Sequence, residues 1–259
     1  MLDVLDGLKL KGIFAGYGKK HILRDVSFTL AKGELISLIG PNGCGKSTLL
    51  KATVGILPIS DGEILIDGRS QRTLSRVEIA KKISYLAQGK ETPDMTVEQM
   101  VLHGRFPHLR YPRRYTEADR ALAASAIERM GLLELANEPM ASLSGGMRQN
   151  AYLAMALTQS TEYLLLDEPT TYLDVSHQLA LMQTLRALSD EGRGVAVVTH
   201  DLPLAFTYSD RIIVMRKGEI AALGTPREVC ASGIVREIFG IELSYDEEAR
   251  EYRYRYRQT

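Results

Sequence analysis

The sequence predicts an α/β protein with a mostly parallel core sheet, an N-terminal antiparallel β subdomain and an inserted α-helical subdomain. Short, nearly continuous apolar runs are typical of strands that are buried on both faces of a parallel sheet. Longer segments with helical periodicity lie between these runs, as in layered α/β proteins with right-handed crossovers. Before about residue 68, glycine-containing turns separate short strands, which favours a small antiparallel sheet.

Four apolar runs are expected to form the buried core strands: Leu35–Ile39, Ile83–Leu86, Tyr163–Leu166 and Val195–Val198. Two segments have helical spacing, Thr116–Met130 and Val175–Ser189. Thr116 is expected to cap the first of them, and Gly131 to end it, because a hydroxyl satisfies free N–H groups and glycine adopts the left-handed C-terminal conformation.

The antiparallel subdomain is expected to contain the strands Leu8–Tyr17, Val26–Leu30 and Glu63–Ile66. We expect a single domain over 1–259, with residues 1–88 and 160–240 forming the core and its antiparallel subdomain. Residues 89–159, which contain no convincing buried strand, are expected to form the helical insertion. In the tail, 241–259, Tyr and Arg alternate. That alternation predicts an edge strand with Tyr252, Tyr254 and Tyr256 on one face, or a frayed terminus.

Composition gives no sign of bulk electrostatic attraction to a polyanionic partner. The 259 residues contain 32 basic and 32 acidic side chains, so the net charge gives no indication of nucleic-acid binding. The two cysteines, Cys44 and Cys230, are too few for a disulfide scaffold, which favours a reducing compartment. The N-terminus lacks the pattern of a signal peptide, and no apolar run approaches the ~20 residues that span a bilayer.

The strongest local signal is a complete phosphate-binding loop that follows the strand Leu35–Ile39. Its residues are Gly40, Pro41, Asn42, Gly43, Cys44, Gly45, Lys46, Ser47 and Thr48. Glycines let the backbone curl so that N–H groups point at phosphate oxygens, and the following helix N-terminus adds partial positive charge. Lys46 is expected to reach the β and γ phosphates of ATP, and the Ser47 hydroxyl to ligate Mg²⁺. The alternative is a glycine-rich turn with an exposed lysine.

A second signal is the strand Tyr163–Leu166, which ends in the acids Asp167 and Glu168. Asp167 is expected to hold Mg²⁺ through its water shell, and Glu168 to act as the general base toward the attacking water. Both can reach one site if the chain turns at the strand end. On its own, the pair is equally compatible with a helix cap after a strand.

The third signal is Leu143-Ser144-Gly145-Gly146-Met147-Arg148-Gln149, which opens a helical segment. Ser144 can cap that helix. The loop at Gly40, this segment and the acids at Asp167 together resemble, in order and separation, the nucleotide-binding domain of ABC proteins. The resemblance covers about residues 8–239, and it implies a P-loop NTPase core that binds and hydrolyses ATP with Mg²⁺.

The resemblance implies roles for further residues. Tyr17 matches the aromatic residue that stacks on adenine, although a tyrosine buried in a β-ribbon is the alternative. Gln88 matches the glutamine that contacts Mg²⁺ and the attacking water. Asp174 matches the loop that crosses between subunits. His200 matches the histidine that contacts the γ-phosphate, where a lone histidine would otherwise be structural.

The family arrangement also implies a head-to-tail homodimer. Each ATP then lies between the Gly40–Thr48 loop of one subunit and Ser144, Gly145 and Gly146 of the other. Two residues depart from the common pattern: Met147 stands where Gln or Glu is usual, and Asn150 stands where Arg is usual. These departures bear on the rate of hydrolysis more than on nucleotide binding.

Two segments resemble the corresponding segments of ATPases that drive import of iron–siderophore, haem and cobalamin. Within that group, the resemblance is closest to the ferric-citrate and ferric-siderophore branch. They are Pro169–Gln178 and Val101–His108. This implies a peripheral subunit on the cytoplasmic face of the inner membrane, bound to permease subunits and served indirectly by a substrate-binding protein. His103 and His108 are expected to be ordinary loop histidines.

Two alternatives to iron-chelate import stay open. One is transport of another cargo, including haem or cobalamin. Another is a non-transport ABC ATPase in translation or DNA repair, which would often carry two nucleotide domains or long coiled coils. A P-loop kinase is disfavoured because it has no need of the Leu143–Gln149 segment.

Overall fold

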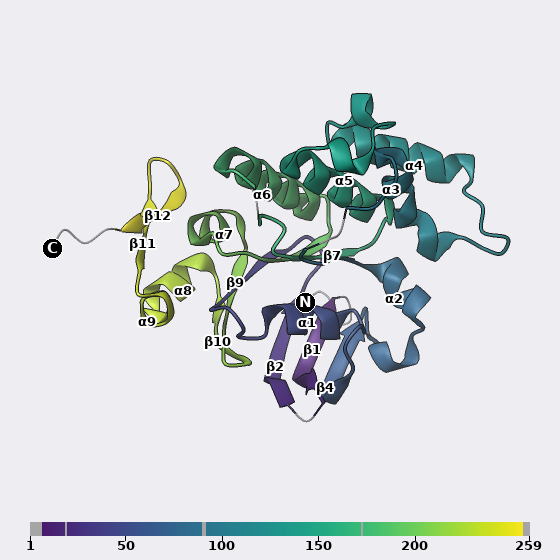
Figure 1. The fold of residues 1–259 in the computed structure, drawn as a ribbon. Helices are drawn as coiled ribbons and strands as arrows, with labels where there is room; N and C mark the ends of the chain where they lie inside the picture. Colours follow the sequence, from purple (N-terminus) through teal and green to yellow (C-terminus); the bar gives the residue numbers. More distant parts are fainter. Residues whose placement is uncertain (1–6, 19, 90–91, 172, 256–259) are drawn as a thin grey trace.

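A computed structural model describes residues 7–18, 20–89, 92–171 and 173–255 of the chain. Its core is a six-stranded sheet in the order β10-β9-β3-β8-β7-β6, in which only the pair β10–β9 is antiparallel (Figure 1). The strands are β3 (Leu35–Ile39), β6 (Ile83–Leu86), β7 (Tyr163–Asp167), β8 (Gly194–Val198), β9 (Arg211–Arg216) and β10 (Glu219–Gly224). The four buried strands predicted from apolar runs are confirmed.

The antiparallel sheet near the N-terminus has the order β2-β1-β4-β5 and lies against the opposite side of the core sheet from most helices (Figure 1). Its strands are β1 (Leu8–Tyr17), β2 (Lys20–Leu30), β4 (Ile59–Ile66) and β5 (Arg69–Ser70). Helix α1 (Lys46–Thr53) lies between the two sheets, and α2 (Arg76–Lys82) leads back to β6. The predicted mixed architecture, with parallel core and antiparallel subdomain, is thus confirmed.

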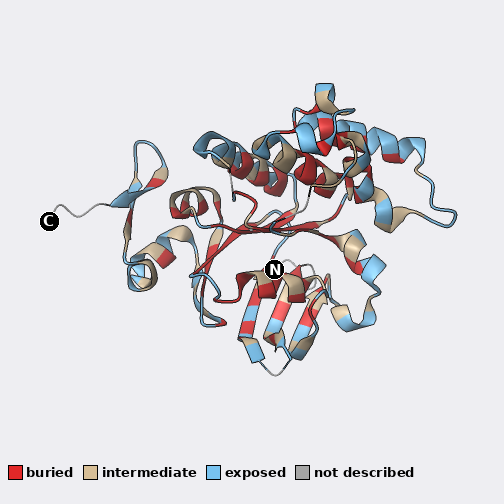
Figure 2. Ribbon diagram, in the orientation of Figure 1, coloured by how far each residue is buried: buried red, intermediate tan, exposed pale blue. Residues whose placement is uncertain are grey.

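The other face of the core sheet carries α3 (Val97–Leu102), α4 (Glu117–Arg129), α5 (Gly145–Thr158) and α6 (Val175–Asp190), as Figure 1 shows. Short 3₁₀ turns link them at His103–His108, Leu133–Leu135 and Met140–Ser142. The predicted Thr116 cap is present, because its hydroxyl accepts from Asp119 N while the Asp119 carboxylate accepts from Thr116 N. Buried residues line the sheet and the inner helix faces, and the outer faces are exposed (Figure 2).

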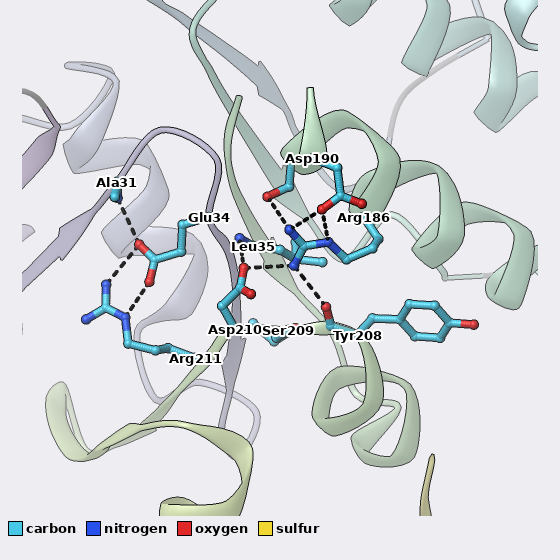
Figure 3. A network of polar contacts seen from close by, with 11 residues as sticks. Ala31, Glu34, Leu35, Arg186, Asp190, Tyr208, Ser209, Asp210 and Arg211 are labelled. Carbon is cyan, nitrogen blue, oxygen red and sulfur yellow. Dashed lines mark hydrogen bonds and ion pairs between the residues drawn. The ribbon is translucent and has the colours of Figure 1, made fainter. Parts of the chain in front are cut away.

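A network of ion pairs and hydrogen bonds connects α6 to the core sheet near the starts of β3 and β9 (Figure 3). Arg186 of α6 donates to Asp210 (2.8 Å), and the same Asp210 carboxylate accepts from the backbone N–H of Leu35 at the start of β3 (2.8 Å). Glu34 pairs with Arg211 at the start of β9. The network therefore ties a helix and two strands together at the end of the sheet where β3 begins.

The C-terminal part comprises α7 (Leu202–Tyr208), α8 (Pro226–Ala231), α9 (Ile234–Phe239) and a hairpin of β11 (Glu242–Asp246) with β12 (Glu251–Arg255). The predicted tail strand exists, but it pairs with β11 and does not extend either larger sheet. Tyr252 is buried and its ring meets Phe206 of α7 edge-on, whereas Tyr254 is partly exposed. Tyr256 lies outside the described residues.

Candidate functional site

The phosphate-binding loop turns from β3 into α1 through left-handed glycines. Gly40 has φ +155°, and a Cβ there would lie 2.4 Å from the carbonyl oxygen of Met215. Gly45, with φ +111°, stands at the N-terminus of α1. Because both positions exclude a side chain, the loop can close around a phosphate group and aim the first N–H groups of α1 inward.

Lys46 is 4% exposed and bends back over the loop that precedes it. Its ammonium group donates to the carbonyl oxygens of Gly40 (2.8 Å) and Pro41 (3.2 Å). Among the described residues its hydrogen-bond partners are these neutral carbonyls, and a buried cation so placed favours an anionic partner. The predicted contact of Lys46 with phosphate oxygens fits this placement.

Cys44 lies inside the same loop and is 6% exposed. Burial raises the pKa of its thiol above the ordinary value, although Lys46 acts in the opposite direction. The thiol is therefore less reactive than a free cysteine at neutral pH. In the described part of the chain, both cysteines are free thiols.

Asp167 ends β7 and faces the first turn of α1. Its carboxylate accepts from the Ser47 hydroxyl (2.9 Å) and from the Tyr85 hydroxyl on β6 (3.2 Å). Burial raises the pKa of Asp167, because desolvation outweighs these two hydrogen bonds. Among the described residues, no cationic side chain forms an ion pair with Asp167, although the positive charge of Lys51 acts weakly to lower its pKa.

Glu168 has φ +49°, a left-handed conformation that is uncommon for a residue with a side chain. This turn brings Glu168 to the same edge of the sheet as Asp167, which the sequence alone could only suppose. One carboxylate oxygen accepts from the Gln88 amide (2.6 Å), and the other contacts His200 Nε2 (2.8 Å). Gln88 follows β6 and His200 follows β8, so three parallel strands deliver the cluster to one edge.

Tyr17 lies at the end of β1 with 54% of its surface exposed. The alternative of a tyrosine buried in the β-ribbon is therefore not met. An exposed aromatic face is available for stacking on a base.

The remaining predicted residues form a separate exposed group at the N-termini of α5 and α6. Ser144 caps α5 by accepting from Met147 N (3.3 Å), and Gly145 and Gly146 form its first turn. Asp174 caps α6 by accepting from His177 N (2.9 Å), and three local hydrogen bonds lower the pKa of Asp174 to about 2. Tyr172, in the same segment, lies outside the described residues.

A cleft of about 280 Å³ separates the Gln88 turn from the start of α5. Gln88, Glu168, Gly145, Arg148 and Tyr152 are among the residues that line it. Gly145 is thus the one member of the exposed group among the residues that line this cleft with Glu168. Of the two departures from the family pattern, Met147 is exposed, and Asn150 donates to the carbonyl oxygen of Met130 (3.3 Å).

The two histidines of the 101–108 segment contact backbone carbonyl oxygens. His103 Nδ1 contacts the carbonyl oxygen of Gln99 (2.8 Å), and His108 Nε2 contacts that of Gln159 (3.0 Å). Within the described ranges, no group of three or more His, Cys, Asp or Glu side chains could hold a metal ion.

Sequence reasoning missed two residues. Tyr85 donates to Asp167 from the neighbouring strand, and His177 packs on Gly146 and contacts Asp174. The alternation of side chains along a strand predicts which face of β6 carries Tyr85, but it does not predict that the Tyr85 hydroxyl reaches Asp167. For His177, its position three residues after the cap Asp174 does not by itself predict a contact with α5.

A phosphate-binding loop after a parallel strand, with an acid at the end of a neighbouring strand hydrogen-bonded to the loop serine, defines a P-loop nucleoside triphosphatase. Among P-loop nucleoside triphosphatases, the Ser144-Gly145-Gly146 turn at the start of α5 is the feature that resembles ABC proteins. Residues 23–171 match the family model described as ABC transporter, and the chain belongs to that family. The predicted family and its ATPase activity are confirmed.

Relatives cover nearly the whole chain. An iron(3+)-hydroxamate import ATP-binding protein, FhuC of Bacillus subtilis, is 41% identical over 92% of this chain and 89% of its own length. The ferric enterobactin transport ATP-binding protein FepC of Escherichia coli is 37% identical over 93% and 90%. A solved metal-chelate type ABC transporter in an inward-facing conformation has a TM-score of 0.83 and 25% identity, covering 97% of each chain. None of the described helices is both long and apolar enough to cross a bilayer.

Proposed function

We propose that this chain is the ATP-hydrolysing motor subunit of an ABC importer and that it drives uptake of an iron chelate of the siderophore or ferric citrate type. The observation that carries the motor assignment is the cluster of Ser47, Asp167, Glu168, Gln88 and His200 beside the phosphate-binding loop. The iron-chelate assignment rests on the relatives, whose names specify hydroxamate and enterobactin transport.

The donor set beside the loop fits Mg²⁺. The Ser47 hydroxyl and the Asp167 carboxylate are hard oxygen ligands 2.9 Å apart, and the carboxylate is buried without an ion-pair partner among the described residues. Mg²⁺ favours few protein oxygens, with water and phosphate oxygens as its other ligands. When bound with ATP, it would neutralise charge on the β and γ phosphates. Gln88 follows the neighbouring strand β6 and donates its amide N–H to Glu168, and its amide oxygen would be a further hard ligand.

Glu168 is the group best placed to accept the proton of the attacking water. Its backbone turn and its contacts with Gln88 and His200 hold the carboxylate in one orientation. Lys46 would leave its two carbonyl partners for the β and γ phosphate oxygens. His200, 49% exposed, would move from Glu168 to the γ-phosphate as ATP binds.

A second copy of the chain would complete the site. Ser144, Gly145 and Asp174 lie on the exposed face at the starts of α5 and α6, so a two-fold partner can present them to the nucleotide held by the Gly40–Thr48 loop. Permease subunits in the inner membrane would bind the dimer from the cytoplasmic side. A substrate-binding protein would act indirectly, through the permease.

One alternative cargo has specific support. A hemin import ATP-binding protein, HmuV of Rhodococcus jostii, is 37% identical over 90% of this chain and 80% of its own length. Because the motor does not contact the cargo, cargo identity depends on the permease and its binding protein.

Affinity isolation of tagged Glu168→Gln from native membranes with MgATP tests the proposal. We expect a polytopic permease and a chelate-binding protein to co-purify, and the isolated wild-type complex in liposomes to take up radiolabelled iron as a siderophore complex. Lys46→Ala serves as the nucleotide control. Recovery of ribosomal or DNA-repair components without a permease would overturn the transport role and leave the ATPase assignment intact.

A further inference from the structure

His177, on the first turn of α6, lies between two parts of the exposed group that the proposed function assigns to the partner's nucleotide. We infer that His177 is a positioning residue that fixes Asp174 against the Ser144-Gly145-Gly146 turn of its own subunit. The two elements then approach the opposite nucleotide as one rigid surface. This inference rests on the proposed function and adds a residue to it.

The first observation is the hydrogen bonding of Asp174. Its Oδ1 atom accepts from the backbone N–H of His177 (2.9 Å) and contacts the Nδ1 atom of the same residue (2.7 Å). The Ser176 hydroxyl donates to the same oxygen (2.8 Å). All three of these contacts to the Asp174 side chain use Oδ1. The Oδ2 atom can therefore accept a hydrogen bond from a donor on another subunit.

The second observation is the close approach of the His177 ring to Gly146. A Cβ at Gly146 would lie 2.5 Å from Cδ2 and 2.8 Å from Nε2 of the ring. Gly146 is in the first turn of α5, and alanine is intrinsically favoured over glycine in a helix, by roughly 1 kcal/mol in its interior. The ring is therefore the feature that excludes a side chain at Gly146.

Stability is a poor explanation for this arrangement. The side chains of His177 and Asp174 are 46% and 65% exposed, and exposed pairs of this kind contribute about 0–1 kcal/mol to folding. Through His177, the contact instead links Gly146 of α5 to Asp174 at the start of α6. Both lie on the face that the proposed function assigns to a partner subunit. A small shift of either element changes its alignment with a reacting group, which is costly for catalysis.

The first test compares three variants in steady-state ATP hydrolysis. His177→Ala is expected to lower kcat on the order of tenfold while changing the KM for ATP little, because the phosphate-binding loop is untouched. His177→Asn keeps an amide N–H where Nδ1 stands and is expected to recover most of kcat. His103→Ala, in which another exposed histidine is removed, is the matched control. Equal kcat in His177→Ala and wild type would overturn the inference.

The second test measures melting temperature and needs no activity. Gly146→Ala is expected to lower the melting temperature because the methyl group meets the ring. Adding His177→Ala is expected to restore most of the loss. If Gly146→Ala is equally destabilising with and without the ring, the inferred contact is wrong. An inactive wild-type chain would contradict the proposed function, and this melting comparison would still decide the contact.

Discussion

The two halves of the candidate site differ in how far one chain completes them. Around the phosphate-binding loop, Lys46 is buried and hydrogen-bonded to the loop that precedes it. Ser47, Asp167 and Glu168 are hydrogen-bonded to residues of other strands or turns. At the starts of α5 and α6, Ser144 and Asp174 are exposed and hydrogen-bond only to residues of their own helix among those described. On the proposed function, the first half binds nucleotide within one chain, and the second half contacts the nucleotide of a partner subunit.

Lys46→Ala is expected to have the largest effect, because it removes the buried cation of the complete half. We expect ATP hydrolysis to fall about 100-fold or more and binding of a fluorescent ATP analogue to weaken strongly. Lys81→Ala, which removes an exposed lysine of α2, should leave both unchanged. Near-normal turnover in Lys46→Ala would show that the loop is not the phosphate site.

Ser144→Ala is expected to separate the two halves. The loss of the α5 cap should cost about 1 kcal/mol of stability, and hydrolysis should fall because the partner's nucleotide loses a contact. ATP binding by the single chain should persist. Thr116→Ala removes the equivalent cap of α4 and should cost similar stability without affecting hydrolysis. If both variants lower hydrolysis equally, the effect of Ser144 is only structural.

The smallest expected effect is a change in the rate at which the Cys44 thiol is alkylated. In a Cys230→Ser background, a maleimide should react slowly at pH 7, since burial of the thiol raises its pKa and lowers its thiolate fraction. The rate should increase as pH rises toward that pKa. MgATP should slow the reaction further, and alkylated protein should lose ATP binding. Equal labelling with and without MgATP would contradict the placement of Cys44 beside the nucleotide.

The complete half was also the more predictable from the sequence. The phosphate-binding loop and the acids after β7 are local patterns, and buried apolar strands fix which edge of the sheet they share. The left-handed turn at Glu168 and the hydroxyl of Tyr85 on Asp167 depend on packing between strands, so no local pattern contained them.

The exposed half shows a different limit. Ser144 and Asp174 were assigned by resemblance, because a helix cap by itself says nothing about a second subunit. The contact of His177 with Gly146 joins residues that are 31 positions apart and follows only from how the first turns of α5 and α6 meet. The tail illustrates the same point: its alternation predicted a strand, but its pairing with β11 depends on a segment for which no strand was predicted.

The central claim is that one chain carries half of each of two sites and that ATP joins them. The most direct test is sedimentation of Glu168→Gln, which should bind MgATP without hydrolysing it, at protein concentrations where the apo chain is a monomer. We predict a dimer that forms only with MgATP and that is weakened by His177→Ala in the same background. A Glu168→Gln chain that binds MgATP and remains a monomer would contradict the account.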